Sequence, residues 1–374
     1  MKGDHFPAER RVFQDDRTGR EIWQITNSGF ESSHLYFYNS SFTPKGDKVI
    51  LMRGNRHGES NIYSVNMDDF EITQLTEGRH VMKSGTKACC ISNDGKQVFF
   101  TEGPEIWSVD IETFEENRIC SALETFSIID RGVRSLTYCH PSPDGKKIVA
   151  VYNAPFNKEW GLIVIRTDGS GGEAILRSRD EIGHCQFCPT DSNILEYCNY
   201  GGFNNPDKVG NRMWLINADG TGGRALGSLA PRDWVRHEYW SSSGREIYFS
   251  WKALFGKAYN NPKEKEFYPP KGHTVEVRKI QRDGQNEETV VTLNHCHSMI
   301  NNDGTFIVAD NDLGKADDLK LVNLATKGVT ILCYSKATWK SGVFHPHPSF
   351  SPDDQKIIYT SDATGHCEVY LAIL

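Results

Sequence analysis

The sequence has little that would attach it to nucleic acid or to a membrane. It carries 49 acidic and 42 basic residues among 374, which gives a formal net charge of −7. Phosphate backbones and anionic membrane surfaces attract basic proteins, so neither is expected as the main partner. No apolar run approaches the about 18 residues that a membrane-spanning helix needs. The opening segment, MKGDHFPAERRVFQDD, has no apolar stretch, so we expect no secretory signal and a cytoplasmic location.

Common catalytic signatures are also missing. The chain has no G-x-S-x-G nucleophile elbow and no G-x-x-x-x-G-K-[ST] phosphate-binding loop. Its ten cysteines are expected to be reduced thiols, many of them buried. What the sequence does have is 33 glycines and 11% aromatic residues, a composition that fits a turn-rich β protein.

A short segment recurs seven times, at intervals of 49, 50, 46, 53, 60 and 50 residues. Each copy has an anchor residue, a few small or polar residues, a turn and a β-rich run, as in PSPDGKKIVAV from Pro141 and FSPDDQKIIYT from Phe350. Four residues after each anchor stands a residue that tolerates a hairpin turn. These seven residues are Gly46, Gly95, Gly145, Asp191, Gly244, Gly304 and Asp354. A further strand, turn and strand follow most copies, so one unit of about 50 residues holds four strands, as a propeller blade does.

The two ends of the sequence complement each other. The last copy stops at EVYLAIL, after three strands, while RTGREIWQIT at 17–26 matches the final hairpin of the other copies. Residues 21–26 should therefore complete the blade that begins near His345 and remove its exposed edge. We predict an all-β, seven-bladed β-propeller with four-stranded blades, the last closed by the N-terminal strand, as a single domain over 1–374. A β-sandwich with irregular strands is the alternative.

Histidines recur at one position of this repeat. In a propeller the first strand of each blade lines the central channel, and its residues lie just before the anchor. Three positions before the anchors stand Asn39, Ala88, Tyr138, His184, His237, His297 and His347. Four consecutive blades thus carry histidine at the same register. His295 and His345 lie two residues before two of these, and side chains at i and i+2 of a strand share a face.

Imidazoles that converge on a channel suit a divalent transition metal. His297, His345 and His347 would supply three ligands from adjacent blades and leave positions open for substrate or water. The alternative is that these histidines are separate, hydrogen-bonded channel residues. His184 is either a neighbour that supports the metal ligands or a packing residue.

Arg212 begins a later strand of the blade that precedes His237. A cation repels a metal ion unless an anion lies between them, so Arg212 suggests a carboxylated ligand. The alternative for Arg212 is a surface salt bridge.

Several of these segments together resemble one family. HPHPSFSPDDQKIIYTSDATGHCEVY, RMWLINADG, HEYW, HCHSMINNDG and the opening REIWQIT are similar to segments of the oligogalacturonate lyases. These are seven-bladed propeller enzymes of pectin breakdown, polysaccharide lyase family 22. The resemblance covers essentially the whole chain, and HPHPSF and HEYW are its most specific parts.

The resemblance implies a metal, usually manganese, held at the positions of His297, His345 and His347. In the family a glutamine three residues before the first HPHP histidine completes that site. Gly342 stands there in this sequence and offers no side-chain ligand, so water or His295 would have to substitute. The resemblance also assigns a general base to His237 and a substrate-binding arginine to Arg212.

The implied activity is cleavage of short 4-linked oligouronides by β-elimination, with 4,5-unsaturated uronate products. A divalent metal, with Mn²⁺ as the first expectation, and Arg212 would stabilise the charge that develops at the substrate carboxylate. Neutral His237 would accept the proton from C5. The expected partner is an oligouronide, and the protein is a monomer or a homodimer. A lyase or epimerase for a different uronic-acid-containing sugar and a non-catalytic, TolB-like binding propeller stay open as alternatives.

Overall fold

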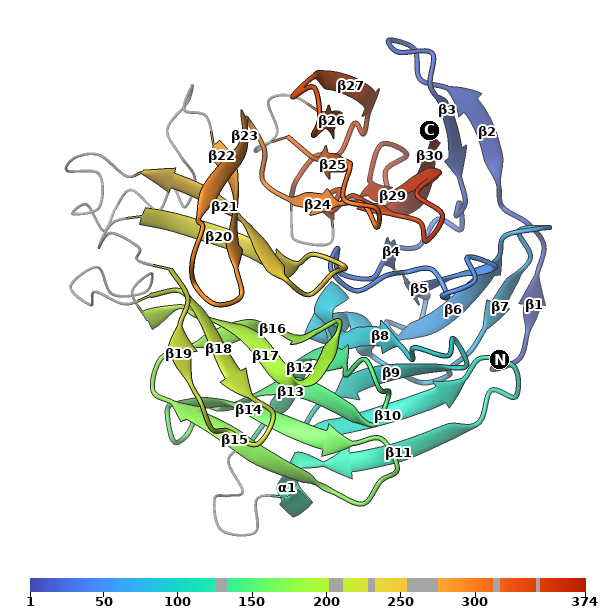
Figure 1. Cartoon of the computed structure of the whole chain (residues 1–374). Helices are drawn as coiled ribbons and strands as arrows, with labels where there is room; N and C mark the ends of the chain where they lie inside the picture. The colour runs from blue at the N-terminus through green and yellow to red at the C-terminus, as the bar shows by residue number, and fades with distance from the viewer. Residues whose placement is uncertain (126–132, 202–210, 228–232, 254–274, 312–316, 341–343) are drawn as a thin grey trace.

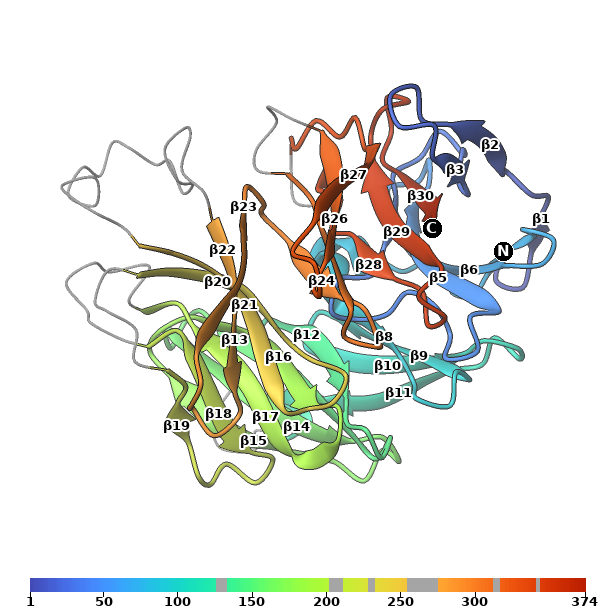
Figure 2. The ribbon, with the colours of Figure 1, turned by 45° about the horizontal axis from the view of Figure 1, so that its top comes forward.

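Seven antiparallel sheets surround a common centre in the computed structural model of the chain (Figure 1). The structure describes residues 1–125, 133–201, 211–227, 233–253, 275–311, 317–340 and 344–374. Each sheet is a blade whose first strand lies at the centre and whose later strands follow outward in chain order, and Figure 2 shows the ring tilted. The predicted all-β, seven-bladed propeller is confirmed.

The blades are built from consecutive strands. The first blade contains β4 (Ser32–His34), β5 (Lys48–Gly54), β6 (Ser60–Asn66) and β7 (Ile72–Gln74). The second contains β8 (Cys89–Ile91), β9 (Gln97–Glu102), β10 (Glu105–Asp110) and β11 (Glu116–Ser121). The third contains β12 (Ser135–Pro141), β13 (Lys147–Ala154), β14 (Glu159–Arg166) and β15 (Gly172–Ser178). The fourth contains β16 (Ile182–Cys188), β17 (Asp191–Asn199), β18 (Met213–Asn217) and β19 (Arg224–Ala225).

The remaining blades follow the same order. The fifth contains β20 (Asp233–Trp240), β21 (Glu246–Ala253), β22 (Val275–Gln281) and β23 (Glu288–Leu293). The sixth contains β24 (Ser298–Ile300), β25 (Phe306–Ala309), β26 (Asp318–Asn323) and β27 (Val329–Tyr334). The seventh contains β28 (Ser349–Phe350), β29 (Lys356–Ser361), β30 (Glu368–Ile373) and the N-terminal β3 (Glu21–Gln24). The described helices are the short η1 (Val81–Ser84), η2 (Thr86–Ala88) and α1 (Ala122–Thr125), and none is long and apolar enough to cross a membrane.

The N-terminal segment closes the ring as predicted. Strand β3 pairs antiparallel with β30, with Trp23 opposite Leu371. Two short strands before it each add a fifth strand at the outer edge of a blade. They are β2 (Arg11–Gln14), which pairs with β3, and β1 (His5–Phe6), which pairs with β7 of the first blade. The first and last blades are therefore joined by backbone hydrogen bonds from one continuous segment.

Six of the seven turn residues of the repeat have the backbone that the sequence predicts. At the position four residues after the anchor, five glycines have φ between 64° and 76°, and Asp354 has φ of 57°. This left-handed region is accessible to glycine at no steric cost and is tolerated by aspartate, which explains the choice of residues there. Asp191 is the exception: it has no positive φ and is already the first residue of β17, so six of the seven hairpins share this turn geometry.

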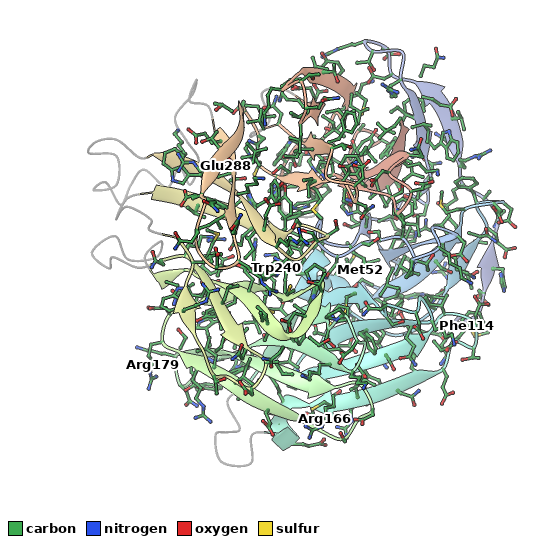
Figure 3. All side chains as sticks on the ribbon, viewed as in Figure 1. Met52, Phe114, Arg166, Arg179, Trp240 and Glu288 are labelled. Carbon is green, nitrogen blue, oxygen red and sulfur yellow. The ribbon has the colours of Figure 1, made fainter. Side chains whose placement is uncertain are left out.

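The core lies between neighbouring blades. One cluster joins Phe99 and Ile106 of the second blade to Leu136, Ile148 and Ile163 of the third, and all five are buried. Burial of each such side chain stabilises the fold by about 1.5–3 kcal/mol. Figure 3 shows that large apolar side chains such as Met52 and Trp240 lie near the hub, whereas the charged Arg166 and Arg179 lie at the rim. All ten cysteines are buried free thiols, as expected.

Aromatic side chains fill the hub itself. Tyr36, Phe37 and Tyr38 follow β4 and are at most 8% exposed. The Phe37 ring lies 6.0 Å from the ring of Tyr239, measured between centroids, in an edge contact. Packed rings therefore surround the histidines of the inner strands, and Phe37 contacts the rings of His237, His297 and His347.

Candidate active site

The innermost strands break their hydrogen-bond ladders where the histidines stand. The pairing of β16 with β17 shifts between Gly183 and Gln186, and that of β20 with β21 shifts between Arg236 and Tyr239. His184, His237 and His347 have φ of 50°, 54° and 45°. For residues other than glycine this conformation costs about 1–3 kcal/mol and persists only where the surroundings enforce it. The bulges therefore turn histidine side chains into the hub.

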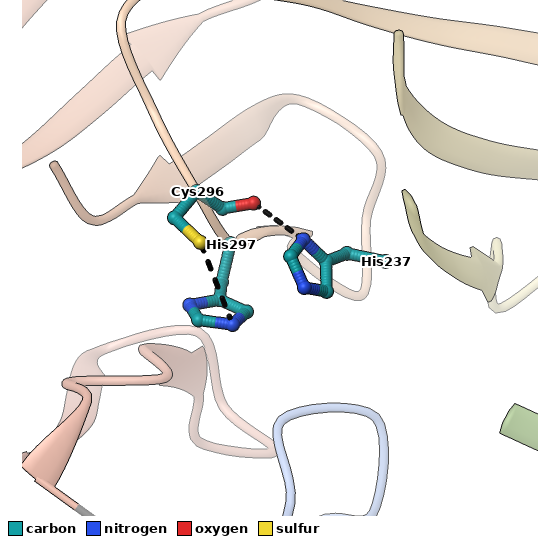
Figure 4. Close-up of side chains that lie close together, drawn as sticks. All are labelled: His237, Cys296 and His297. Atoms are coloured by element: carbon teal, nitrogen blue, oxygen red, sulfur yellow. Dashed lines mark hydrogen bonds between the residues drawn. The ribbon is translucent and has the colours of Figure 1, made fainter. Parts of the chain in front are cut away.

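His297 reaches the hub by a different backbone. It directly precedes β24 and follows a bend at Cys296. The bend interrupts the alternation of side chains that a regular strand would impose. Cys296 and His297, although adjacent in the chain, therefore project to the same side of the backbone (Figure 4).

Three predicted metal ligands lie together in the structure. The ring centroids of His297 and His347 are 4.1 Å apart, those of His297 and His345 are 5.6 Å apart, and those of His345 and His347 are 5.4 Å apart. One ring nitrogen from each residue lies within 4.8 Å of the other two. Ligands of one ion with bonds of about 2 Å stand about 3–4 Å apart, so small side-chain rotations would let these three share an ion. We call these residues the histidine trio.

A buried carboxylate orients the central member of the trio. Asp310, which is fully buried, accepts hydrogen bonds from the backbone N–H of His297 and from its Nδ1, each 2.7 Å long. A carboxylate accepts and does not donate, so the proton of the imidazole is on Nδ1 and the lone pair is on Nε2. This arrangement is usual for metal-binding histidines and raises their basicity. Asp310 was not among the predicted residues; the only signal for it is its position at the end of the inner hairpin INNDGTFIVAD.

His237 has its proton fixed in the same way. Its Nδ1 donates a 2.7 Å hydrogen bond to the backbone carbonyl of Cys296, which can only accept (Figure 4). Nε2 of His237 therefore carries the lone pair. Its ring centroid is 4.3 Å from that of His297, so this lone pair lies beside the trio.

Burial favours the neutral form of His237, His345 and His347. Desolvation is the largest effect and lowers the pKa of His237 and of His347 well below the usual value. Desolvation likewise lowers the pKa of His345 to about 4. Neutral imidazole is the form that binds a metal or accepts a proton, so His237, His345 and His347 are in the reactive form at neutral pH.

Arg212 is not at the surface. It is 9% exposed, and its Nε and Nη2 donate to Oε2 of Glu238 at 3.2 Å each. Nη2 also lies 3.1 Å from Oε1, and the guanidinium stacks over Tyr200 at 4.6 Å. The anion that the sequence argument required near Arg212 is thus a protein carboxylate. Because Glu238 already balances the positive charge of Arg212, the presence of this arginine does not by itself indicate a carboxylated ligand.

His184 connects the arginine pair to the trio. Its Nδ1 lies 3.9 Å from Oε1 of Glu238, and its ring is stacked 6.2 Å from that of His237. Among the described residues it belongs to no group of potential metal ligands. The structure therefore places His184 between Arg212 and His237 rather than in the trio.

His295 does not support the trio. Its Nε2 pairs with the hydroxyl of Ser250 at 2.9 Å and its Nδ1 with the carbonyl of Leu293 at 3.1 Å, so both nitrogens are occupied. The substitution of His295 for the missing glutamine is therefore disfavoured. Gly342, which stands at the position of that glutamine, lies outside the described residues.

Lys87 is a site residue that the sequence did not reveal. Its Nζ donates a 2.8 Å hydrogen bond to the hydroxyl of Tyr138 and lies 5.1 Å from the centroid of Tyr36. Desolvation lowers the pKa of Lys87 to about 8. The Tyr36 ring also contacts His347, with 5.0 Å between centroids, so the ammonium group lies across one aromatic ring from the trio. Lys87 is one residue before the register position, in the short η2, where no strand pattern would point inward.

A cavity of about 460 Å³ lies elsewhere in the hub. It is lined by Phe37, Tyr38, His140 and the turn prolines Pro44 and Pro143, and neither His237 nor any residue of the histidine trio lines it. We therefore place the candidate active site at the histidine cluster and not in this cavity.

Comparison with known proteins identifies the family of this chain. The family model for oligogalacturonate lyase matches residues 1–374. The chain belongs to the oligogalacturonate lyase family. The resemblance inferred from the motifs is thereby confirmed, and the family is one of lyases, so the prediction of an enzyme is confirmed as well.

Relatives of the family cover nearly the whole chain. The oligogalacturonide lyase of Pectobacterium atrosepticum and the oligogalacturonate lyase of Dickeya dadantii are each 28% identical, over 99% of this chain and 97% of theirs. A solved oligogalacturonate lyase in complex with manganese superposes with a TM-score of 0.85 at 25% identity, over 100% of this chain and 98% of that one. A Vibrio parahaemolyticus structure, 24% identical with a TM-score of 0.84 over 100% and 98%, supports the fold.

Proposed function

We propose that this chain is a metal-dependent lyase that cleaves short 4-linked oligogalacturonates by β-elimination, with all seven blades acting as one domain. The observation that carries the proposal is the position of His237, whose Nε2 lone pair lies beside the histidine trio at a ring separation of 4.3 Å. Elimination removes the weakly acidic C5 proton of a uronate and therefore needs a base next to groups that stabilise negative charge. In this proposal His237 is the base, and the metal held by the histidine trio stabilises the negative charge.

The residues present suit a divalent metal. The trio offers three imidazoles, and the carboxylate of Asp310 accepts a hydrogen bond from one of them, His297. We propose Mn²⁺ as the ion because a similar solved structure is a manganese complex. When bound, the ion would act as a Lewis acid on the substrate carboxylate. Three protein ligands leave coordination positions open for that carboxylate.

His237, Arg212 and Lys87 have separate roles in the proposed reaction. Nε2 of His237 accepts the C5 proton; the electron pair of the C5–H bond forms the C4–C5 double bond, and the C4–O bond breaks with its electrons on the departing oxygen. Arg212, held by Glu238 through Nε and Nη2, lies within the same buried cluster and stabilises a uronate carboxylate. Lys87 supplies a second positive charge for that substrate.

The test is a lyase assay over a panel of uronide oligomers, with and without a chelator. The expected result is an increase in the ultraviolet absorbance of the unsaturated product with oligogalacturonate, abolished by the chelator and restored by Mn²⁺. No increase with any uronide in the presence of Mn²⁺ would refute the proposal. An increase only with a different uronide would retain the chemistry and change the substrate.

A further inference from the structure

A second group of potential metal ligands overlaps the histidine trio. One ligand atom each from His237, Cys296 and His297 lies within 4.8 Å of the other two, and all three residues are buried (Figure 4). His297 belongs to both groups. The second group differs from the trio in containing a thiol and in containing the proposed base.

Two atoms of this group have nearly the separation that a tetrahedral ion requires. Sγ of Cys296 lies 3.8 Å from Nε2 of His297. A tetrahedral zinc ion with bonds of about 2.3 Å to sulfur and about 2.0 Å to nitrogen holds those two ligands about 3.6 Å apart. The sulfur–nitrogen pair of Cys296 and His297 therefore needs almost no rearrangement, and the ligand atom of His237 lies within 4.8 Å of both. The bend at Cys296 is what makes this possible, since neighbouring residues of a regular strand would point to opposite faces.

Both imidazoles are already in the tautomer that such an ion requires. Nδ1 of His297 is bonded to Asp310 and Nδ1 of His237 to the carbonyl of Cys296, so each ring keeps its lone pair on Nε2. The third ligand is a thiolate, so binding releases the thiol proton to solvent. Thiolate selects soft or borderline ions such as Zn²⁺, whereas Mn²⁺ stands lowest in the affinity order for such sites.

We propose that His237, Cys296 and His297 form an inhibitory site for Zn²⁺ and similar thiophilic ions. One lone pair binds one ion, so His297 cannot serve this site and the trio at once. An ion here also occupies Nε2 of His237. Zinc bound at this position would therefore remove both the base and one ligand of the trio. The inhibitory consequence rests on the proposed function, whereas the binding site does not.

The decisive experiment detects the sulfur–metal bond directly. Co²⁺ added to the metal-free full chain should produce a thiolate-to-cobalt charge-transfer absorption, which Cys296→Ala abolishes. His345→Ala removes a ligand of the trio alone and should keep this absorption. Cys333→Ala, which changes another buried free cysteine in the same blade, should also keep it. Absence of the charge-transfer absorption in the unchanged protein, or its persistence in Cys296→Ala, would overturn the site.

The second measurement is zinc inhibition, with each variant referred to its own Mn²⁺-supported rate. Loss of a supporting residue around a metal costs about 10–100-fold in affinity, so loss of a direct ligand should raise the inhibitory Zn²⁺ concentration by at least about 100-fold. Excess Mn²⁺ should relieve inhibition of the unchanged protein. If zinc inhibited Cys296→Ala at the same concentration as the unchanged protein, the inhibitory zinc would be bound in the trio. That result would overturn the proposal that this site mediates inhibition. The cobalt spectrum tests the metal site even if no uronide is cleaved. Failure of the metal site can therefore be distinguished from failure of the proposed lyase function.

Discussion

Replacement of Asp310 by asparagine should weaken metal binding without a large change of shape. The carboxylate accepts two hydrogen bonds of 2.7 Å, from the backbone N–H and from Nδ1 of His297, and it is fully buried. An amide has one acceptor oxygen and one donor group, so Asp310→Asn can satisfy only one of the two N–H groups. If the NH₂ group faces the ring, Nδ1 must become the acceptor and the proton moves to Nε2, where it blocks the ion.

The expected magnitude follows from this loss of support. Removal of a partner that orients a metal-binding histidine costs about 10–100-fold in affinity, which corresponds to about 1.4–2.8 kcal/mol. Electron paramagnetic resonance of free Mn²⁺ during a titration measures this affinity without any substrate. Urea unfolding of the metal-free protein should accompany it, so that a loss of fold is not mistaken for a loss of binding.

Asp303→Asn is the matched control. Asp303 is an exposed turn residue of the same sixth blade, and asparagine serves equally well in such turns. Its Mn²⁺ affinity should equal that of the unchanged protein. A dissociation constant of Asp310→Asn within about twofold of the unchanged protein would show that Asp310 does not prepare His297 for a metal, against the magnitude expected for such partners.

The remaining predictions concern the rest of the site. His237→Ala should lower kcat by about 10²–10⁴-fold with Mn²⁺ content retained, and loss of the metal instead would contradict a role as base. His345→Ala should lower the Mn²⁺ content measured by elemental analysis; unchanged content would remove His345 from the trio. Glu238→Gln should destabilise the protein by about 3–5 kcal/mol in urea unfolding, because Arg212 loses its buried carboxylate, and a change below about 1 kcal/mol would refute that pairing. Lys87→Met should raise KM for oligogalacturonate more than it lowers kcat; an unchanged KM would exclude Lys87 from substrate binding.

Much of the architecture could be read from the sequence because its causes are local. Turn residues at a constant offset from each anchor fix where the hairpins begin, and Gly145 or Asp354 shows that backbone in the structure. The spare strand at the N-terminus predicted the closure that β3 and β30 form. The shared register of His184, His237, His297 and His347 placed these residues at the hub for the same reason: equivalent positions in equivalent blades face one axis.

The distinct roles of these histidines depend on neighbours that the register does not specify. His184 and His297 occupy the same position of the repeat, yet one lies 3.9 Å from Glu238 and the other bonds to Asp310. Whether an imidazole binds a metal, accepts a proton or packs depends on which nitrogen holds its proton, and that is set by one hydrogen bond.

Those hydrogen bonds, and the burial that keeps the rings neutral, exist only after the ring has closed. Glu238 stands next to His237 in the chain, but a regular strand would send the two side chains to opposite faces; the bulge alters that, and the pair with Arg212 joins two blades. Lys87 enters the hub from a short helix that has no period to reveal it. The sequence by itself determined how many blades there are and which residues face the axis. The tertiary structure decided which of these residues touch, because contact between blades is a matter of distances across the ring and not of spacing along the chain.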